Sequence, residues 1–194
     1  LPVNFSPSSN IEETQTVFAG FGISTDNYNS FEGLDVKDKW VIVFRGSPKD
    51  KKDLQRFGPL VNKAQQAKKL GAKGIIYIKG PNPNVGAMLV PPTQNVGSNN
   101  DILPSITISD ELAGAILGGT QNGKFKELFN QYFNSNKIVG FPLPYSIKAR
   151  IGLDKNEDQG RNVIARLKVN EVTSNEAVMV CLLYTSPSPR DVST

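Results

Sequence analysis

The sequence contains no histidine and a single cysteine in 194 residues. A Ser–His–Asp or Cys–His site needs an imidazole that accepts the proton of its nucleophile near neutral pH, so the absence of histidine excludes both kinds of site. Cys181 has no second cysteine with which to form an intramolecular disulfide. Apolar runs are also short, because none approaches the roughly 20 residues that a membrane-spanning helix needs. We therefore expect no membrane span.

The composition indicates one soluble domain. Apolar residues make up 38% of the sequence and charged residues 21%, and the length suffices for one buried core but not for two large domains. The net charge is +4, and basic and acidic residues alternate, as in KDKKD at residues 49–53. A nucleic-acid interface would require arginines and lysines clustered on one face, so we expect no nucleic-acid partner.

The C-terminal segment differs from the rest of the chain. From Cys181 to Asp191 it reads CLLYTSPSPRD, which matches the translation of a transposase-type sequencing adapter. We therefore expect residues 181–194 to be an adapter-derived tail. The preceding residues contain no cysteine, which excludes thiolate catalysis and cysteine-ligated zinc there.

One βαβ unit is predicted in the first half of the chain. Residues 40–44, WVIVF, form a continuous apolar run that is typical of a central strand buried on both faces. A second strand is expected from Gly74 to Ile78, directly after Gly71, which supplies the left-handed residue that ends a helix. The helix between them has an apolar side and a polar side: Leu60, Val61, Ala64 and Ala67 on the first, and Lys63, Gln65, Gln66, Lys68 and Lys69 on the second.

The remaining pattern predicts further strands and helices around a long surface loop over Gly80 to Leu103. A strand is expected from Pro104 to Ser109, and Ser109 caps a helix that ends at Gly118-Gly119. Another helix carries an apolar stripe that we expect to pack as core: Phe125, Leu128, Phe129, Tyr132 and Phe133. Strands from Tyr145 to Leu153 and from Asn162 to Val169 are predicted to form a hairpin able to close the sheet.

Three segments fall short of known ligand motifs. Gly20-Phe21-Gly22 lacks the third glycine of a dinucleotide-binding loop, and Gly86 is followed by Ala87-Met88 instead of the Lys-Ser/Thr of a phosphate-binding loop. The residues from Asp154 onward resemble the start of a calcium loop, but its sixth position is Gln159 and its twelfth is Ala165. We interpret all three segments as turns.

Five blocks occur in a fixed order: VFAGFGIS, KDKWVIVFRGSP, KAQQAKKLGAKGIIYIKG, LPSITIS and GRNVIARL. In this order they resemble the protease-associated (PA) domain inserted into bacterial two-zinc aminopeptidases of metallopeptidase clan MH, family 28. The resemblance implies a mixed α/β fold, a β-sandwich or open barrel-like sheet flanked by helices, with one βαβ crossover. The expected organisation is a lead-in from a missing N-terminal part (1–14), the PA domain (15–169), the first strand of a truncated peptidase domain (170–180) and the tail.

The resemblance implies a non-catalytic lid that controls the access of peptide substrates to its own catalytic domain. In the family, the first zinc ligand follows the strand that here ends at Val180, so no catalytic or metal-binding residue is carried over. We expect the fragment to be inactive and without a cofactor, and the parent to hold two zinc ions and to be exported to the periplasm or beyond, with no signal peptide in this chain. The expected substrate-access residues lie in two polar loops: Arg45, Ser47, Asp50, Lys51, Arg56, Asn82, Asn84 and Gln94.

Two alternative origins are open. The domain can belong to another host, such as a subtilisin-like protease or a sorting receptor, in which it serves as a recognition module. It can also belong to a catalytically silent, transferrin-receptor-like relative of the aminopeptidases. GRNVIARL resembles the aminopeptidase junction and disfavours the first alternative, whereas only sequence beyond Val180 separates the second from an active enzyme.

Overall fold

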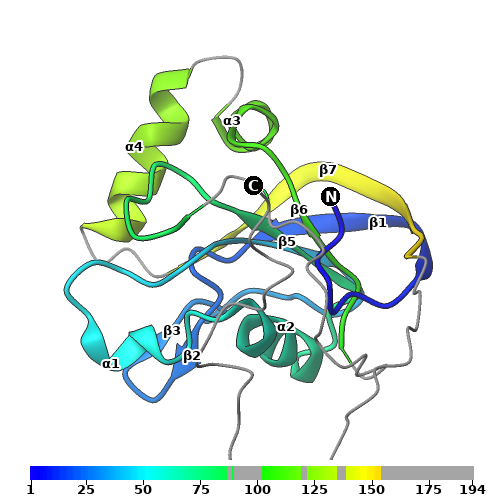
Figure 1. Cartoon of the computed structure of the whole chain (residues 1–194), viewed down its shortest axis with the longest axis horizontal. Helices are drawn as coiled ribbons and strands as arrows, with labels where there is room; N and C mark the ends of the chain where they lie inside the picture. The colour runs from blue at the N-terminus through cyan, green and yellow to red at the C-terminus, as the bar shows by residue number, and fades with distance from the viewer. Residues whose placement is uncertain (87–88, 90–101, 119–121, 135–138, 154–194) are drawn as a thin grey trace, which may run out of the picture. The chain divides into compact units, whose positions relative to one another are not determined.

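The computed structural model describes residues 1–86, 89, 102–118, 122–134 and 139–153 (Figure 1). These residues form a five-stranded sheet with strand order β6-β5-β4-β1-β7, a two-stranded ribbon β2-β3 and four helices. No helix in these ranges is long and apolar enough to cross a bilayer. The strands are β1 (Ser9–Phe18), β2 (Ser24–Thr25), β3 (Tyr28–Asn29), β4 (Trp40–Phe44), β5 (Gly74–Ile78), β6 (Ser105–Thr107) and β7 (Phe141–Ile151), and the helices are α1 (Lys52–Gln55), α2 (Leu60–Lys69), α3 (Asp110–Gly118) and α4 (Asn122–Phe133).

The sheet is mostly parallel. β4 lies at its centre, parallel to β1 on one side and to β5 on the other, and β6 is parallel to β5. β7 is antiparallel to β1. The predicted βαβ unit is confirmed as β4–α2–β5, and so are the mixed α/β class and the central position of the apolar run.

Each face of the sheet packs against its own helices. Trp40, Ile42 and Phe44 of β4 belong to the core that α3 and α4 cover, whereas Val41 and Val43 belong to the core that α2 covers (Figure 1). All five side chains are fully buried. A strand buried on both faces needs apolar side chains at every position, which explains why the run is continuous.

Aromatic rings fill the core beneath α4. The Phe44 and Phe129 rings meet edge to face with their centroids 5.0 Å apart, and Phe18 and Tyr132 do the same at 5.2 Å. Edge-to-face pairs place the positive edge of one ring against the negative face of the other. The apolar stripe of α4 is therefore core, as predicted. The cap of α3 is also confirmed, since Leu112 N donates to Ser109 Oγ at 3.3 Å.

The opposite face is covered by α2. Ala64 and Ala67 of this helix are fully buried, and the Tyr77 hydroxyl of β5 donates to Leu60 O at 2.8 Å. The helix ends as predicted, because Gly71 has φ = +83° and its N–H donates to Lys68 O. A residue without a β-carbon adopts this left-handed conformation at no steric cost.

The edge formed by β1 and β7 differs from the prediction. β7 begins at Phe141, four residues before the predicted start, and its partner among the described residues is β1, with Ser9 opposite Ile151 and Phe18 opposite Phe141. β1 was not predicted as a strand: the polar residues of its first half are largely exposed and leave a weak apolar pattern, and Val17 and Phe18 were identified only as the start of a sequence block. The strand expected over 162–169 lies outside the described residues.

The first residues of the chain pack on the other edge of the sheet. Val3 N donates to Ser105 O at 3.1 Å, and Val3 and Phe5 are buried. Pro2 forms an isolated antiparallel bridge with Ile106 of β6. The segment expected to lead into the domain therefore contributes to its core.

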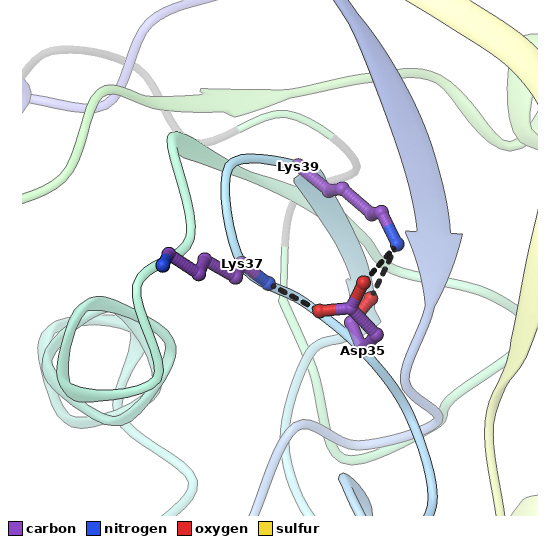
Figure 2. Close-up of polar contacts among 3 residues, drawn as sticks. All are labelled: Asp35, Lys37 and Lys39. Atoms are coloured by element: carbon purple, nitrogen blue, oxygen red, sulfur yellow. Dashed lines mark hydrogen bonds and ion pairs between the residues drawn. The ribbon is translucent and has the colours of Figure 1, made fainter.

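A charged turn fixes the entry into β4. The Asp35 carboxylate accepts hydrogen bonds from Lys37 N at 3.2 Å and from Lys39 Nζ at 2.7 Å (Figure 2). The hydrogen bond from Lys39 lowers the pKa of Asp35. Asp38 N donates to Gly71 O at 2.9 Å, which ties this turn to the end of α2. The amino ends of β4 and β5 are thereby joined on one side of the sheet.

Candidate functional site

The loops that follow β4, β5 and β6 lie at the carboxyl ends of these strands. We call this end of the sheet the candidate edge. Since these strands are parallel, their carboxyl ends lie at the same edge, where open α/β sheets bind ligands. Gly80, after β5, donates its N–H to Asp110 Oδ1 at the start of α3, at 2.9 Å. Asn82 Nδ2 donates to Arg45 O, after β4, at 3.1 Å. The two loops that were predicted to carry substrate-access residues therefore touch each other.

Asn82 is a buried residue that links the loop after β5 to the loop after β4. Its side chain is 2% exposed, and its Oδ1 accepts a hydrogen bond from Asn84 N at 3.0 Å. A buried amide with both ends bonded fixes the backbone around it. Asn82 is therefore a structural link between the loops, whereas Asn84 is exposed.

Arg45 places a cationic side chain at this edge, directly after β4. Its side chain is half-buried, and burial lowers its pKa, while the nearby Asp110 carboxylate acts in the opposite direction. The Gly80–Asp110 hydrogen bond holds this carboxylate, at the start of α3, beside the loop that follows β5. A guanidinium in such a place can donate hydrogen bonds to carbonyl or carboxylate oxygens.

The other predicted residues are distributed along the loop after β4. Ser47 is half-buried, and Asp50 is exposed with φ = +60°. Lys51 Nζ lies 6.0 Å from the centroid of the Tyr28 ring, and Arg56 Cζ lies 4.8 Å from that of Phe57. Lys51 and Arg56 therefore contact aromatic rings of Tyr28 and Phe57, away from the Asn82–Arg45 hydrogen bond. Gln94 lies outside the described residues.

Lys63 corrects the prediction for α2. It was assigned to the polar side of the helix, but its side chain is fully buried. Its Nζ donates to three backbone carbonyls: Phe21 O, Phe44 O at 2.9 Å and Gly46 O at 2.7 Å. The signal was present in the sequence, since position 63 lies three residues after Leu60 and four before Ala67, within the apolar stripe.

The accessible side chains of this edge offer hydrogen-bond donors and acceptors for recognition. Arg45, Ser47 and Asn84 supply a guanidinium, a hydroxyl and an amide. Within the described ranges, no group of three or more histidine, cysteine, aspartate or glutamate side chains is placed to hold a metal ion.

A comparison with protein-family models matches residues 12–116 to the PA domain. The match spans more than half of the chain and runs from β1 into α3, so it includes both loops of the candidate edge. The helix α4 and the strand β7 follow it. A comparison with curated proteins gives no match.

Proposed function

The chain belongs to the PA domain family, and from this premise we propose that it is the non-catalytic substrate-access module of a two-zinc aminopeptidase. The family supports a protease-associated module. The choice of the aminopeptidase host is supported by the order of the five sequence blocks and by GRNVIARL, which resembles the junction with a peptidase domain of family 28.

The contact between the two loops carries the proposal. Because Asn82 ties its own loop to Arg45 O, the loops after β4 and β5 form one polar surface at the carboxyl edge of the sheet. Such a surface, placed beside a catalytic cleft, changes which peptide reaches the cleft without supplying a proton donor or a nucleophile. Arg45 and Asn84 are the side chains that we propose to contact peptide oxygens.

The chemistry belongs to the proposed partner, the catalytic domain of the same protein. Two zinc ions there would activate water and polarise the scissile carbonyl. This chain's part is to bind and orient the peptide and to limit its length. We further propose that residues 170–180 begin that catalytic domain, that residues 181–194 are an adapter-derived tail, and that the parent is exported.

Reading the source locus through the adapter junction tests the choice of host. We expect the uninterrupted frame to continue after Val180 with a segment similar to Gly-Ala-His-x-Asp-His, and to supply later a bridging aspartate, a Glu-Glu pair and a further histidine. A frame that keeps the strand but lacks the histidine would make the parent catalytically silent. A frame that enters an unrelated domain would defeat the aminopeptidase host.

Peptide-length selectivity of the parent enzyme tests the role of the edge. We expect Arg45→Ala to change kcat/KM for tetrapeptides and longer substrates by about tenfold and to leave a dipeptide almost unaffected, because a contact remote from the reacting atoms acts through binding. Lys69→Ala, at an exposed position of α2, is the matched control. An equal loss for all lengths would mean that Arg45 supports the fold instead of selecting substrates.

The chain alone gives a complementary measurement. We expect the purified fragment to contain no stoichiometric zinc by elemental analysis and to release no amino acid from peptides, since it lacks histidine and isolated carboxylates are poor tetrahedral zinc ligands. Stoichiometric zinc or turnover would contradict this assignment.

A further inference from the structure

The buried Lys63 ammonium joins three segments that are distant in sequence. Phe21 lies in the turn after β1, Phe44 is the last residue of β4, and Gly46 lies in the loop of the candidate edge. The ring of Phe21 also lies near the ammonium, with Nζ 5.5 Å from its centroid. All of these groups approach one nitrogen that has no exposure to solvent.

The number of acceptors matches the number of hydrogens on an ammonium group. An ammonium has three N–H donors and a neutral amine only two, so the three carbonyls are all satisfied only by the charged form. Burial lowers the pKa of Lys63, while the carbonyl dipoles favour the charged form. The arrangement is that of a small cation coordinated by backbone oxygens.

Three successive carbonyls at the start of the loop after β4 accept hydrogen bonds from side chains. Lys63 binds Phe44 O and Gly46 O, and Asn82 binds Arg45 O between them. The Arg45 N–H donates to Ile78 O of β5 at 2.8 Å. The backbone from Phe44 to Gly46 is therefore held by two buried side chains and the neighbouring strand.

We propose that Lys63 is a positioning residue that acts as an internal cation. Its ammonium fixes the backbone of residues 44–46 and thereby the orientation of the Arg45 and Ser47 side chains. The assignment of this loop to substrate access rests on the proposed function. The stabilisation of the loop backbone by Lys63 is independent of the proposed function, and it can be measured without a peptidase domain.

Amide hydrogen exchange on the full chain tests the hold. In Lys63→Met, which keeps a long unbranched side chain but removes the ammonium, we expect protection of the Gly22, Phe44 and Arg45 amides to fall about tenfold or more, through local opening. Ile76 in β5 should change much less. Lys69→Met, on an exposed part of the same helix, is the matched control and should leave all four amides unchanged.

Equal loss of protection at Ile76 would show that Lys63 contributes only to global stability, and no loss at Gly22, Phe44 and Arg45 would show that it does not hold the loop. Either result overturns the proposal. Chemical rescue separates the cation from the packing of the stem. For Lys63→Ala, which lacks three carbons and the ammonium of lysine, we expect n-propylammonium chloride, but not sodium chloride at equal ionic strength, to restore protection at these amides.

A measurement on the unmutated chain covers the case in which both variants fail to fold. In protein labelled with ¹⁵N and ¹³C, we expect couplings across hydrogen bonds from Lys63 Nζ to the carbonyl carbons of Phe21, Phe44 and Gly46, with slowly exchanging ammonium protons. Rapid exchange of these protons with solvent, together with missing couplings, would refute the internal cation. That outcome would leave the substrate-access role of the edge untouched, since peptide-length selectivity tests it separately.

Discussion

Trp40 of β4 lies directly opposite Gly74 of β5, and its ring occupies the space that a β-carbon at position 74 would need. A β-carbon built on Gly74 would lie 2.4 Å from Trp40 Cζ3 and 2.6 Å from Cε3. The indole is fully buried in the core that α3 and α4 cover and cannot move aside without displacing other core residues.

We therefore expect Gly74→Ala to reduce the free energy of unfolding by about 3 kcal/mol, the upper part of the range for overpacked cores. Denaturant titration measures the effect. Gly86→Ala is the control, because nothing lies within 4 Å of its added β-carbon. In the double variant Trp40→Leu/Gly74→Ala the cost should be smaller than the sum of the single costs. Additive costs would show that the two residues do not compete for the same space.

The end of α2 supplies a test of backbone conformation. Gly71 has φ = +83°, and the nearest atom to an added β-carbon is Lys37 Cγ at 3.4 Å, so Gly71→Val has room for its first atom but a strained backbone. We expect a loss of about 1–2 kcal/mol in the free energy of unfolding. Gly86→Val, at a position without positive φ, should cost less. A neutral result at position 71 would mean that the helix ends differently.

Lys63 gives a pH dependence with a defined sign. Its pKa in the folded chain lies well below the 10.5 of an ordinary lysine, because burial disfavours the charge. At pH values between the lowered pKa and 10.5, the unfolded chain binds more protons than the folded chain. The contribution of Lys63 to the free energy of unfolding therefore rises with pH in this interval. The difference in stability between wild type and Lys63→Met should therefore shift in favour of wild type as the pH rises through the interval below 10.5.

Denaturant titrations at each pH measure this difference. Lys69→Met serves as the control for the loss of a lysine from an exposed position on the same helix. A wild-type advantage that shrinks as the pH rises toward 10.5 would contradict the lowered pKa.

Deletion of residues 181–194 tests the proposal that they are an adapter-derived tail. On that proposal these residues were never selected to pack on the fold, so removal of everything after Val180 should leave the melting temperature nearly unchanged. Differential scanning calorimetry of the two chains gives the comparison. A fall of more than a few degrees, which corresponds to roughly 1 kcal/mol or more, would mean that the tail belongs to the fold.

Local patterns sufficed to predict the centre of this fold. The apolar run of β4, the glycine that ends α2 and the aromatic stripe of α4 each follow from side-chain chemistry within a few residues. β1 was not predicted as a strand, because its position depends on pairing with β7. That pairing joins segments from opposite ends of the described chain, and no periodicity within residues 9–14 reports it.

The candidate edge was predictable only in part. Arg45 and Asn82 were predicted as residues of two polar loops, and the strand order of the structure places these loops together. The hydrogen bond between them depends on the course of each loop, which a sequence pattern does not encode. Lys63 was missed because its charge outweighed its place in the apolar stripe, and its three acceptors come together only in the folded chain.

The pairing of β1 with β7 also affects the order of events during synthesis. Ser9 leaves the ribosome early, whereas Ile151, its partner, is made after every other described strand and helix. Closing so long a chain segment costs entropy before the contacts form, and non-local strand pairing is slow for that reason. The edge of β1 therefore stays open while most of the domain is being translated, and a nascent chain arrested before Phe141 exposes a strand edge that is prone to pair with other chains.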